Sequence, residues 1–150
     1  MRYTIGFMFS KDKQKVALIR KIKPEWQKGK LNAIGGKIKY NETSIQSICR
    51  EFEEETGYKT TQEQWNYFAQ MIGNPDGGKG PSSVDCFCTI GDLDYLISKE
   101  EEKIEIIETY SYSMLIDMLS NTFWLMHLAI DNLNDGQPQF TIINYITKGD

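Results

Sequence analysis

One segment, residues 36–58 with the sequence GKIKYNETSIQSICREFEEETGY, constrains the fold more than any other part of the chain. Its apolar residues follow a helical period across Thr43–Thr56, and Gly57 stands where a helix C-terminus expects a glycine. Cys49 and Phe52 belong to the apolar stripe. Because such a stripe has to be buried, the segment predicts a helix that packs on a sheet and leaves its other face open.

The open face of this helix is acidic. At about 100° per residue, Glu51, Glu54 and Glu55 fall within an arc of about 100°, whereas Glu53 lies outside it. Like charges three and four residues apart repel by a few tenths of a kcal/mol per pair, so the cluster needs a neutralising partner. We therefore expect the three carboxylates to hold a cation.

The ligand types favour Mg2+ or Mn2+ as that cation. Carboxylate oxygens suit hard divalent ions, whereas zinc would ask for histidine or cysteine, and the single histidine, His127, is remote in sequence. Magnesium held by a few carboxylates keeps positions open for water and substrate phosphates. Gly35 and Gly36, just before the helix, allow close approach of the backbone to metal or phosphate. The implied chemistry is hydrolysis of a phosphate bond.

The rest of the chain supplies a mixed sheet with helices on its faces, an α/β arrangement of the α+β type in one domain over residues 1–150. The predicted strands are Arg2–Phe9, Lys15–Lys21, Leu31–Ile34, Trp65–Ile72, Val84–Ile90, Glu105–Tyr110 and Phe140–Ile146. Two further helices are predicted, at Tyr112–Leu119 and Thr122–Leu133. The Gly- and Pro-rich loop Gly73–Pro81 is a candidate for substrate contacts.

Composition limits the partners and the compartment. A net charge of -4 and a pI near 5.1 give no general attraction to nucleic acids or anionic membranes. Neither a signal peptide nor a membrane span is expected, so we expect a cytoplasmic protein. The three cysteines, Cys49, Cys86 and Cys88, lack metal or redox spacing and are expected to be core or half-buried thiols.

The acidic segment also fits a known pattern, G-x5-E-x7-R-E-aromatic-x-E-E-x-G-aromatic. The fixed positions are Gly36, Glu42, Arg50, Glu51, Glu54, Glu55 and Gly57. This pattern resembles the signature box of the Nudix hydrolases, with no departure at these seven sites. The resemblance implies an α/β/α sandwich that uses a divalent metal to cleave nucleoside diphosphates linked to another group.

The resemblance also implies a role for each matched residue. Glu51, Glu54 and Glu55 would bind the metal, and one of them could also act as the base that deprotonates water. Arg50 would orient these acids, Glu42 would support the loop, and the carbonyl of Gly35 would complete the metal shell.

Many family members add an acid outside the box. The candidates here are the run Glu100–Glu102 and the strand residue Asp85, and we select Glu101. A run of this kind is also typical of a solvated surface. Because the chain is acidic overall, an anionic substrate has to be attracted locally, and we expect Lys23, Lys37 and the backbone of Gly36 to contribute.

The stretch GKLNAIGGK, from Gly29, is similar to the G-x-W-N-x-x-G-G-K strand of the Nudix enzymes that hydrolyse 8-oxo-purine nucleoside triphosphates. The similarity implies that Asn32 reads a base edge, although Leu31 replaces the common tryptophan. An alternative role for Asn32 is to satisfy the backbone at a strand edge. Base-stacking candidates are Trp26, Tyr40, Trp65, Tyr67 and Trp124.

The expected function is hydrolysis of a nucleoside triphosphate, such as 8-oxo-dGTP, to the monophosphate and pyrophosphate. One alternative is a diphosphatase for ADP-ribose, dinucleoside polyphosphates or capped RNA, and Pro75 lies near a proline typical of ADP-ribose enzymes. Another is a Nudix-fold module that binds a nucleotide without cleaving it, although such modules commonly lose box acids. A homodimer is also possible, since family members often dimerise.

Overall fold

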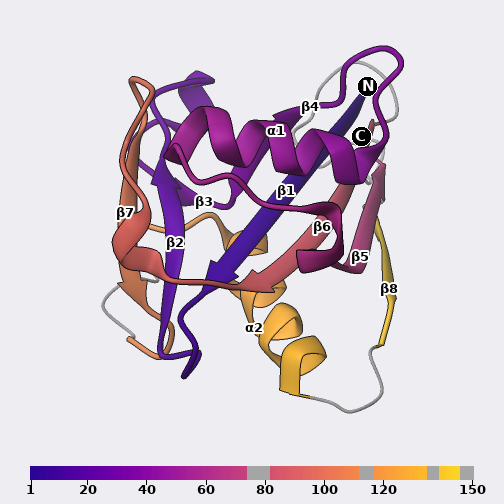
Figure 1. Cartoon of the computed structure of the whole chain (residues 1–150). Coiled ribbons are helices and arrows are strands. Elements are labelled where there is room, and N and C mark those ends of the chain that lie inside the picture. Colours follow the sequence, from indigo (N-terminus) through magenta and orange to yellow (C-terminus); the bar gives the residue numbers. More distant parts are fainter. Residues whose placement is uncertain (74–81, 112–116, 135–138, 146–150) are drawn as a thin grey trace.

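The computed structural model describes residues 1–73, 82–111, 117–134 and 139–145 (Figure 1). Within them, one eight-stranded mixed sheet carries two α-helices and three short 3-10 helices. The strands are β1 (Arg2–Phe9), β2 (Lys15–Arg20), β3 (Leu31–Asn32), β4 (Ile34–Lys37), β5 (Asn66–Gly73), β6 (Ser82–Ile90), β7 (Lys103–Glu108) and β8 (Thr141–Tyr145). The helices are α1 (Ser44–Thr56), α2 (Ser120–Asn134), η1 (Glu25–Gln27), η2 (Gln62–Gln64) and η3 (Leu93–Tyr95).

The sheet forks between β1 and β2. These two strands pair at Met8 with Ala17 and Phe9 with Val16, and beyond that point β3 pairs with β2 while β4 pairs with β1. Residues 31–37 therefore fill the fork. On the other side of β1 the strand order continues through β6, β5 and β8, and β7 pairs with the outer side of β2.

The boundaries of α1 follow from its capping residues. Thr43 and Gln46 form a reciprocal capping box at the N-terminus, and Gly57, with a φ of 72°, closes the C-terminus in the left-handed conformation. Ile48 and Phe52 are fully buried beneath the helix, which packs on β1 and β4. The acidic face consequently points away from the core, as the sequence pattern predicts.

Two apolar clusters, one on each face of the sheet, hold the layers together. Phe52, Ile48 and Trp65 belong to the cluster on the α1 face, whereas Phe7 and Leu125 belong to the cluster on the α2 face. Figure 1 shows α1 in front of the sheet and α2 behind it. The predicted α/β/α sandwich is thus confirmed.

The thiols also agree with expectation, because Cys86 and Cys88 are buried and Cys49 is half-buried, all three unpaired. No helix among the described residues combines the length and the apolar character needed to cross a membrane.

Two sequence-based boundaries need correction. The single strand predicted at Leu31–Ile34 is divided into β3 and β4, because the chain changes partner at the fork. The helix predicted at Tyr112–Leu119 is wrong in its described part, Asp117–Leu119. There the backbone follows β3: the amide of Leu31 donates to the carbonyl of Asp117, and the amide of Leu119 donates to the carbonyl of Leu31. Residues 112–116 lie outside the described residues, as does the loop 74–81 with Pro75.

Candidate active site

Arg50 is the centre of the acidic face of α1. Its guanidinium donates to both carboxylate oxygens of Glu42, at 2.7 and 2.9 Å, and to Glu51 at 2.7 Å and Glu54 at 3.0 Å. It also donates to the carbonyl of Lys37 at 3.2 Å. The planar fork of arginine suits such simultaneous contacts, so one cation orders three carboxylates and ties the helix to the end of β4.

Glu42 fixes the loop that enters α1. The hydrogen bond from Arg50 outweighs the effect of burial and lowers the pKa of Glu42 to about 2. A second hydrogen bond comes from the amide of Lys39, at 3.0 Å. The carboxylate is therefore charged at neutral pH and joins the loop to the helix, which is the supporting role that the sequence resemblance implies.

Gly36 gives the carboxylate of Glu51 its position. A Cβ atom at Gly36 would lie 2.6 Å from the Cδ and Oε2 atoms of Glu51, a distance that real Cβ contacts essentially never reach. The missing side chain thus leaves room for the carboxylate against β4. Gly35 is packed as tightly on its other side, because a Cβ there would collide with the carbonyl of Thr4 in β1.

Glu55 differs from the other acids of this face. Its Oε2 atom is buried and has no hydrogen-bond partner among the described residues. Burial raises the pKa of Glu55 to about 7; Lys21 opposes the shift, and Glu102 and Glu51 add to it. A buried oxygen without a partner is costly, and a bound cation would satisfy it.

The donor set of Glu51, Glu54 and Glu55 fits a hard divalent ion, although the described side chains include no preformed group of three or more acids, histidines or cysteines in metal-binding geometry. Arg50 occupies one oxygen each of Glu51 and Glu54. Each of these two carboxylates therefore keeps its other oxygen for a metal ion while the guanidinium holds the first.

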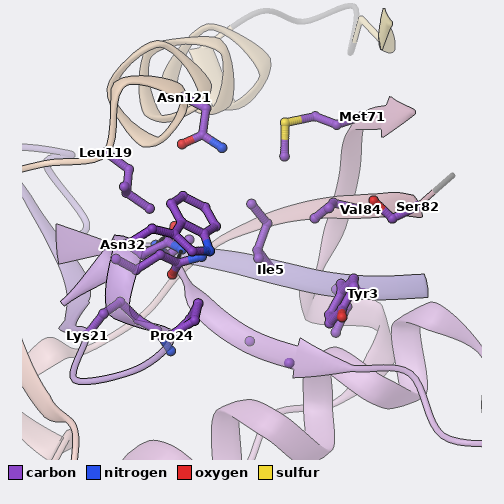
Figure 2. Close-up of a pocket in the computed structure, with 16 residues that line it drawn as sticks. Tyr3, Ile5, Lys21, Pro24, Asn32, Met71, Ser82, Val84, Leu119 and Asn121 are labelled. Carbon is purple, nitrogen blue, oxygen red and sulfur yellow. Dashed lines mark hydrogen bonds between the residues drawn. The ribbon is translucent and has the colours of Figure 1, made fainter. Parts of the chain in front are cut away.

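A pocket of about 260 Å³ adjoins the acids across β4. Gly35 and Gly36 form part of its wall, so Gly36 faces both the pocket and the carboxylate of Glu51. Figure 2 shows Asn121, Leu119 and Met71 on the side of the pocket opposite Ile5. The lining residues are Tyr3, Thr4, Ile5, Lys21, Pro24, Trp26, Gln27, Asn32, Ala33, Gly35, Gly36, Met71, Ser82, Val84, Leu119 and Asn121. A mostly apolar wall with several amides suits a planar polar ligand.

Asn32 lines the pocket, but its side chain already has protein partners. Its Oδ1 atom accepts from the hydroxyl of Thr122 at 2.8 Å and from the amide of Ala33 at 2.8 Å. Its Nδ2 atom donates to Gln27 at 3.2 Å. Asn32 therefore braces the local backbone, which is one of its two predicted roles, and it also lines the pocket; the reading of a base edge stays a prediction.

Of the other predicted contact residues, only some line the pocket. Lys23 and Lys37 are exposed, and the pocket-lining residues include neither of them. Among the stacking candidates, Trp26 lines the pocket and Tyr40 is 95% exposed, whereas Trp65 is buried in the core under α1.

Sequence reasoning missed an ion pair between Lys21 and Glu102. The Nζ atom of Lys21 lies 2.6 Å from Oε2 of Glu102, and both side chains are largely buried. Lys21 lines the pocket, and its positive charge opposes the rise in the pKa of Glu55. It therefore interacts with both the pocket and the acidic face. Glu101, selected from the same acidic run, is exposed. The signal that could have found the pair is charge complementarity between the ends of β2 and β7.

Solved structures with the same fold are similar to this chain at low sequence identity. A MutT/nudix family protein from Enterococcus faecalis is 17% identical with a TM-score of 0.70, over 92% of this chain and 64% of that chain. The NUDIX domain of NrtR from Shewanella oneidensis, complexed with ADP ribose, is 16% identical with a TM-score of 0.74, over 89% and 88%. A bifunctional NMN adenylyltransferase/ADP ribose pyrophosphatase from Francisella tularensis, complexed with AMP and a manganese ion, is 16% identical with a TM-score of 0.66, over 87% and 41%.

The first of these comparisons spans slightly less than two thirds of the other protein's length. The search of curated proteins finds no match by sequence. The NUDIX domain model, by contrast, matches residues 1–117, which include β1 to β7, α1 and the whole acidic segment. The chain therefore belongs to the Nudix family.

Proposed function

We propose that this chain is a divalent-metal-dependent pyrophosphohydrolase that converts a nucleoside triphosphate to the monophosphate and pyrophosphate. The observation that carries the proposal is the shared wall at Gly36, which places the acidic face of α1 directly beside a pocket with amide side chains. A nucleotide needs both parts, one for its phosphates and one for its base.

The metal would be held by Glu51, Glu54 and Glu55 with the carbonyl of Gly35, and it would supply charge neutralisation at the phosphate oxygens and an activated water. Glu55 is the residue proposed to accept the proton of water, because its buried Oε2 atom has no hydrogen-bond partner among the described residues and can therefore take a proton. Arg50 keeps the other acids in place, and Lys21 offers a positive charge to phosphate oxygens at the mouth of the pocket.

A second candidate is a diphosphatase for ADP-ribose or a dinucleotide. It is favoured by the likeness to the NrtR domain complexed with ADP ribose and to the Francisella tularensis ADP ribose pyrophosphatase. Both candidates use the same acids and differ in the group that occupies the pocket, so substrate preference separates them.

The test is hydrolysis of a substrate panel with Mg2+ or Mn2+, with the products separated by chromatography. The panel contains ordinary and 8-oxo nucleoside triphosphates, ADP-ribose, diadenosine polyphosphates and capped RNA. Glu54→Gln removes a proposed ligand, and Glu53→Gln is the matched control because Glu53 is an exposed neighbour outside the acidic arc.

We expect the wild type and the control to convert a triphosphate to the monophosphate and pyrophosphate, and Glu54→Gln to be slower by about 100-fold or more. Preference for ADP-ribose or a dinucleotide would replace the first candidate with the second. Nucleotide binding without metal-dependent turnover would contradict both and identify a binding module.

A further inference from the structure

Glu102 is the buried acid of the run Glu100–Glu102, and both of its carboxylate oxygens are already in use. Oε2 accepts from Nζ of Lys21 at 2.6 Å. Oε1 accepts from the backbone amides of Ile22 at 2.8 Å and Lys23 at 3.3 Å. Burial favours a higher pKa, but these hydrogen bonds outweigh it and keep the pKa of Glu102 below its ordinary value. The side chain is therefore a charged and fully bonded anchor, in contrast to Glu55 with its unpartnered oxygen.

The residues that Glu102 holds form the start of a loop between β2 and β3. The loop is closed at its base by backbone hydrogen bonds between Lys21 and Lys30, at 2.9 Å, and between Gly29 and Lys21, at 2.8 Å. Beyond this base it carries Pro24 and Trp26 to the wall of the pocket. The pocket wall thus depends on how the loop is attached to the sheet.

A second acid, in β7, holds the other end of this loop. Glu105 in β7 forms two contacts with the guanidinium of Arg20, at 2.5 and 2.7 Å. The same guanidinium donates to the carbonyl of Gly29 at 2.9 Å. Glu102, just before β7, and Glu105, within it, therefore attach the beginning and the end of the loop to neighbouring points of the chain.

We infer that Glu102 is a positioning residue, which fixes the loop at residues 21–27 as the wall of the substrate pocket and does not bind the metal. A cation at Glu102 would have to replace Lys21 and two amides that already neutralise and satisfy the carboxylate. The unpartnered carboxylate oxygen that a metal could use is found at Glu55 instead. The inference rests on the proposed function only in taking the pocket as the nucleotide site.

The test compares Glu102→Gln and Glu102→Ala with Glu108→Gln, an exposed glutamate at the end of β7, the strand that begins just after Glu102. Glutamine retains an oxygen for the amide of Ile22 but loses the charge that holds Lys21, whereas alanine loses every contact. The first readout is Mn2+ binding to the protein alone, followed by electron paramagnetic resonance. The second is amide hydrogen exchange at Ile22 and Lys23, and the third is KM separately from kcat on the best substrate of the panel.

We expect Mn2+ affinity in both Glu102 variants to stay within about twofold of the wild type, because no ligand is lost. Exchange at Ile22 should accelerate by about tenfold or more in Glu102→Ala, and KM should rise by about tenfold in both variants with kcat nearly unchanged. Glu108→Gln should match the wild type in all three.

A loss of Mn2+ affinity of about tenfold or more in Glu102→Gln would overturn the inference, because Glu102 would then contribute to the metal site. The inference would also be overturned if the amides of Ile22 and Lys23 exchanged as slowly in Glu102→Ala as in the control, Glu108→Gln. If the alanine variant unfolds, Glu102→Gln still decides through Mn2+ affinity and KM. The metal and exchange readouts do not require hydrolysis, so failure of the proposed function remains distinguishable from failure of this inference.

Discussion

The acidic face of α1 and the pocket behind β4 are neighbours, but they are assembled in different ways. The acids come from one helix and the short loop before it, and Arg50 joins Glu42, Glu51 and Glu54 within eight residues on either side. The pocket takes its walls from β1, β3, β4, β5, β6, the loop at residues 21–27 and the start of α2. Local sequence determines the first region, whereas long-range packing determines the second.

This difference predicts how each region fails. A change in the acidic face should alter both metal binding and the chemical step, because the same side chains are proposed to bind the metal and to take part in the reaction. A change in the pocket should alter substrate affinity and leave the chemical step nearly intact, because in the proposed complex most lining residues other than Lys21 would contact the ligand away from its phosphates.

Arg50→Ala should have the largest effect. Glu42 would lose its partner while its side chain is only 13% exposed, and Glu51 and Glu54 would lose the group that orders them. The free energy of unfolding should fall by about 3 kcal/mol, and kcat by about 100-fold or more. Chemical denaturation and steady-state kinetics measure the two effects.

Arg2→Ala is the matched control for that variant. Arg2 pairs with the buried Asp85, but its own side chain is 59% exposed, and Asp85 keeps its hydrogen bonds from Tyr67 and Gln70. Its kcat should stay near the wild type. Equal loss of kcat in Arg2→Ala would show that Arg50 acts only through general stability.

The second prediction concerns acid stability through Glu42. The pKa of Glu42 is about 2 in the folded chain, against an ordinary value of 4.5. The charged carboxylate therefore contributes fully to the free energy of unfolding above pH 4.5, and this contribution is lost as the pH falls towards 2. At pH 7 the free energy of unfolding of the wild type should exceed that of Glu42→Gln by no more than about 3 kcal/mol, and this difference should become smaller as the pH falls from 4.5 to 2. Urea denaturation at several pH values measures it. A gap that does not change with pH would contradict the ion pair, and Glu53→Gln should show no gap.

Sequence alone located α1 and its acids because the signals are local. The capping residue Thr43, the helical period and Gly57 all lie within one segment, and the structure places the helix one residue inside the predicted start. The resemblance to the Nudix box then assigned the family, which the match over residues 1–117 confirms. The individual roles of Glu51, Glu54 and Glu55 in metal binding remain predictions.

The Lys21–Glu102 pair could not be predicted in the same way. The two residues are 81 positions apart, and only the pairing of β2 with β7 brings them together. Glu101 and Glu102 lie in a bend just before β7, so the sequence offers no periodicity that shows which of the two is buried. Asn32 presents a similar problem, since its partner Thr122 is 90 residues away.

Gly36→Ala should disturb the boundary between the two regions. The new methyl group would collide with the carboxylate of Glu51, which would have to move away from β4. We expect Mn2+ affinity and kcat each to fall by about tenfold, with less effect on KM. Mn2+ titration and kinetics test this. Gly91→Ala is the control, because its methyl group would meet only the flexible side chain of Met8; a tenfold loss of Mn2+ affinity there would show that the Gly36 effect is not local.

Trp26→Ala should have the smallest effect and gives the sharpest separation of the two regions. Trp26 lines the pocket from η1 and remains 50% exposed, so its removal deletes apolar ligand contact with little loss of core packing. If the indole contacts a base, KM should rise by about tenfold while kcat and Mn2+ affinity stay near the wild type. Steady-state kinetics and Mn2+ titration measure this, with Tyr95→Ala as the control, because Tyr95 is 70% exposed and is not among the lining residues. A fall in kcat as large as that of Gly36→Ala, with KM unchanged, would mean that the pocket acts on the chemical step and that the two regions are not separable.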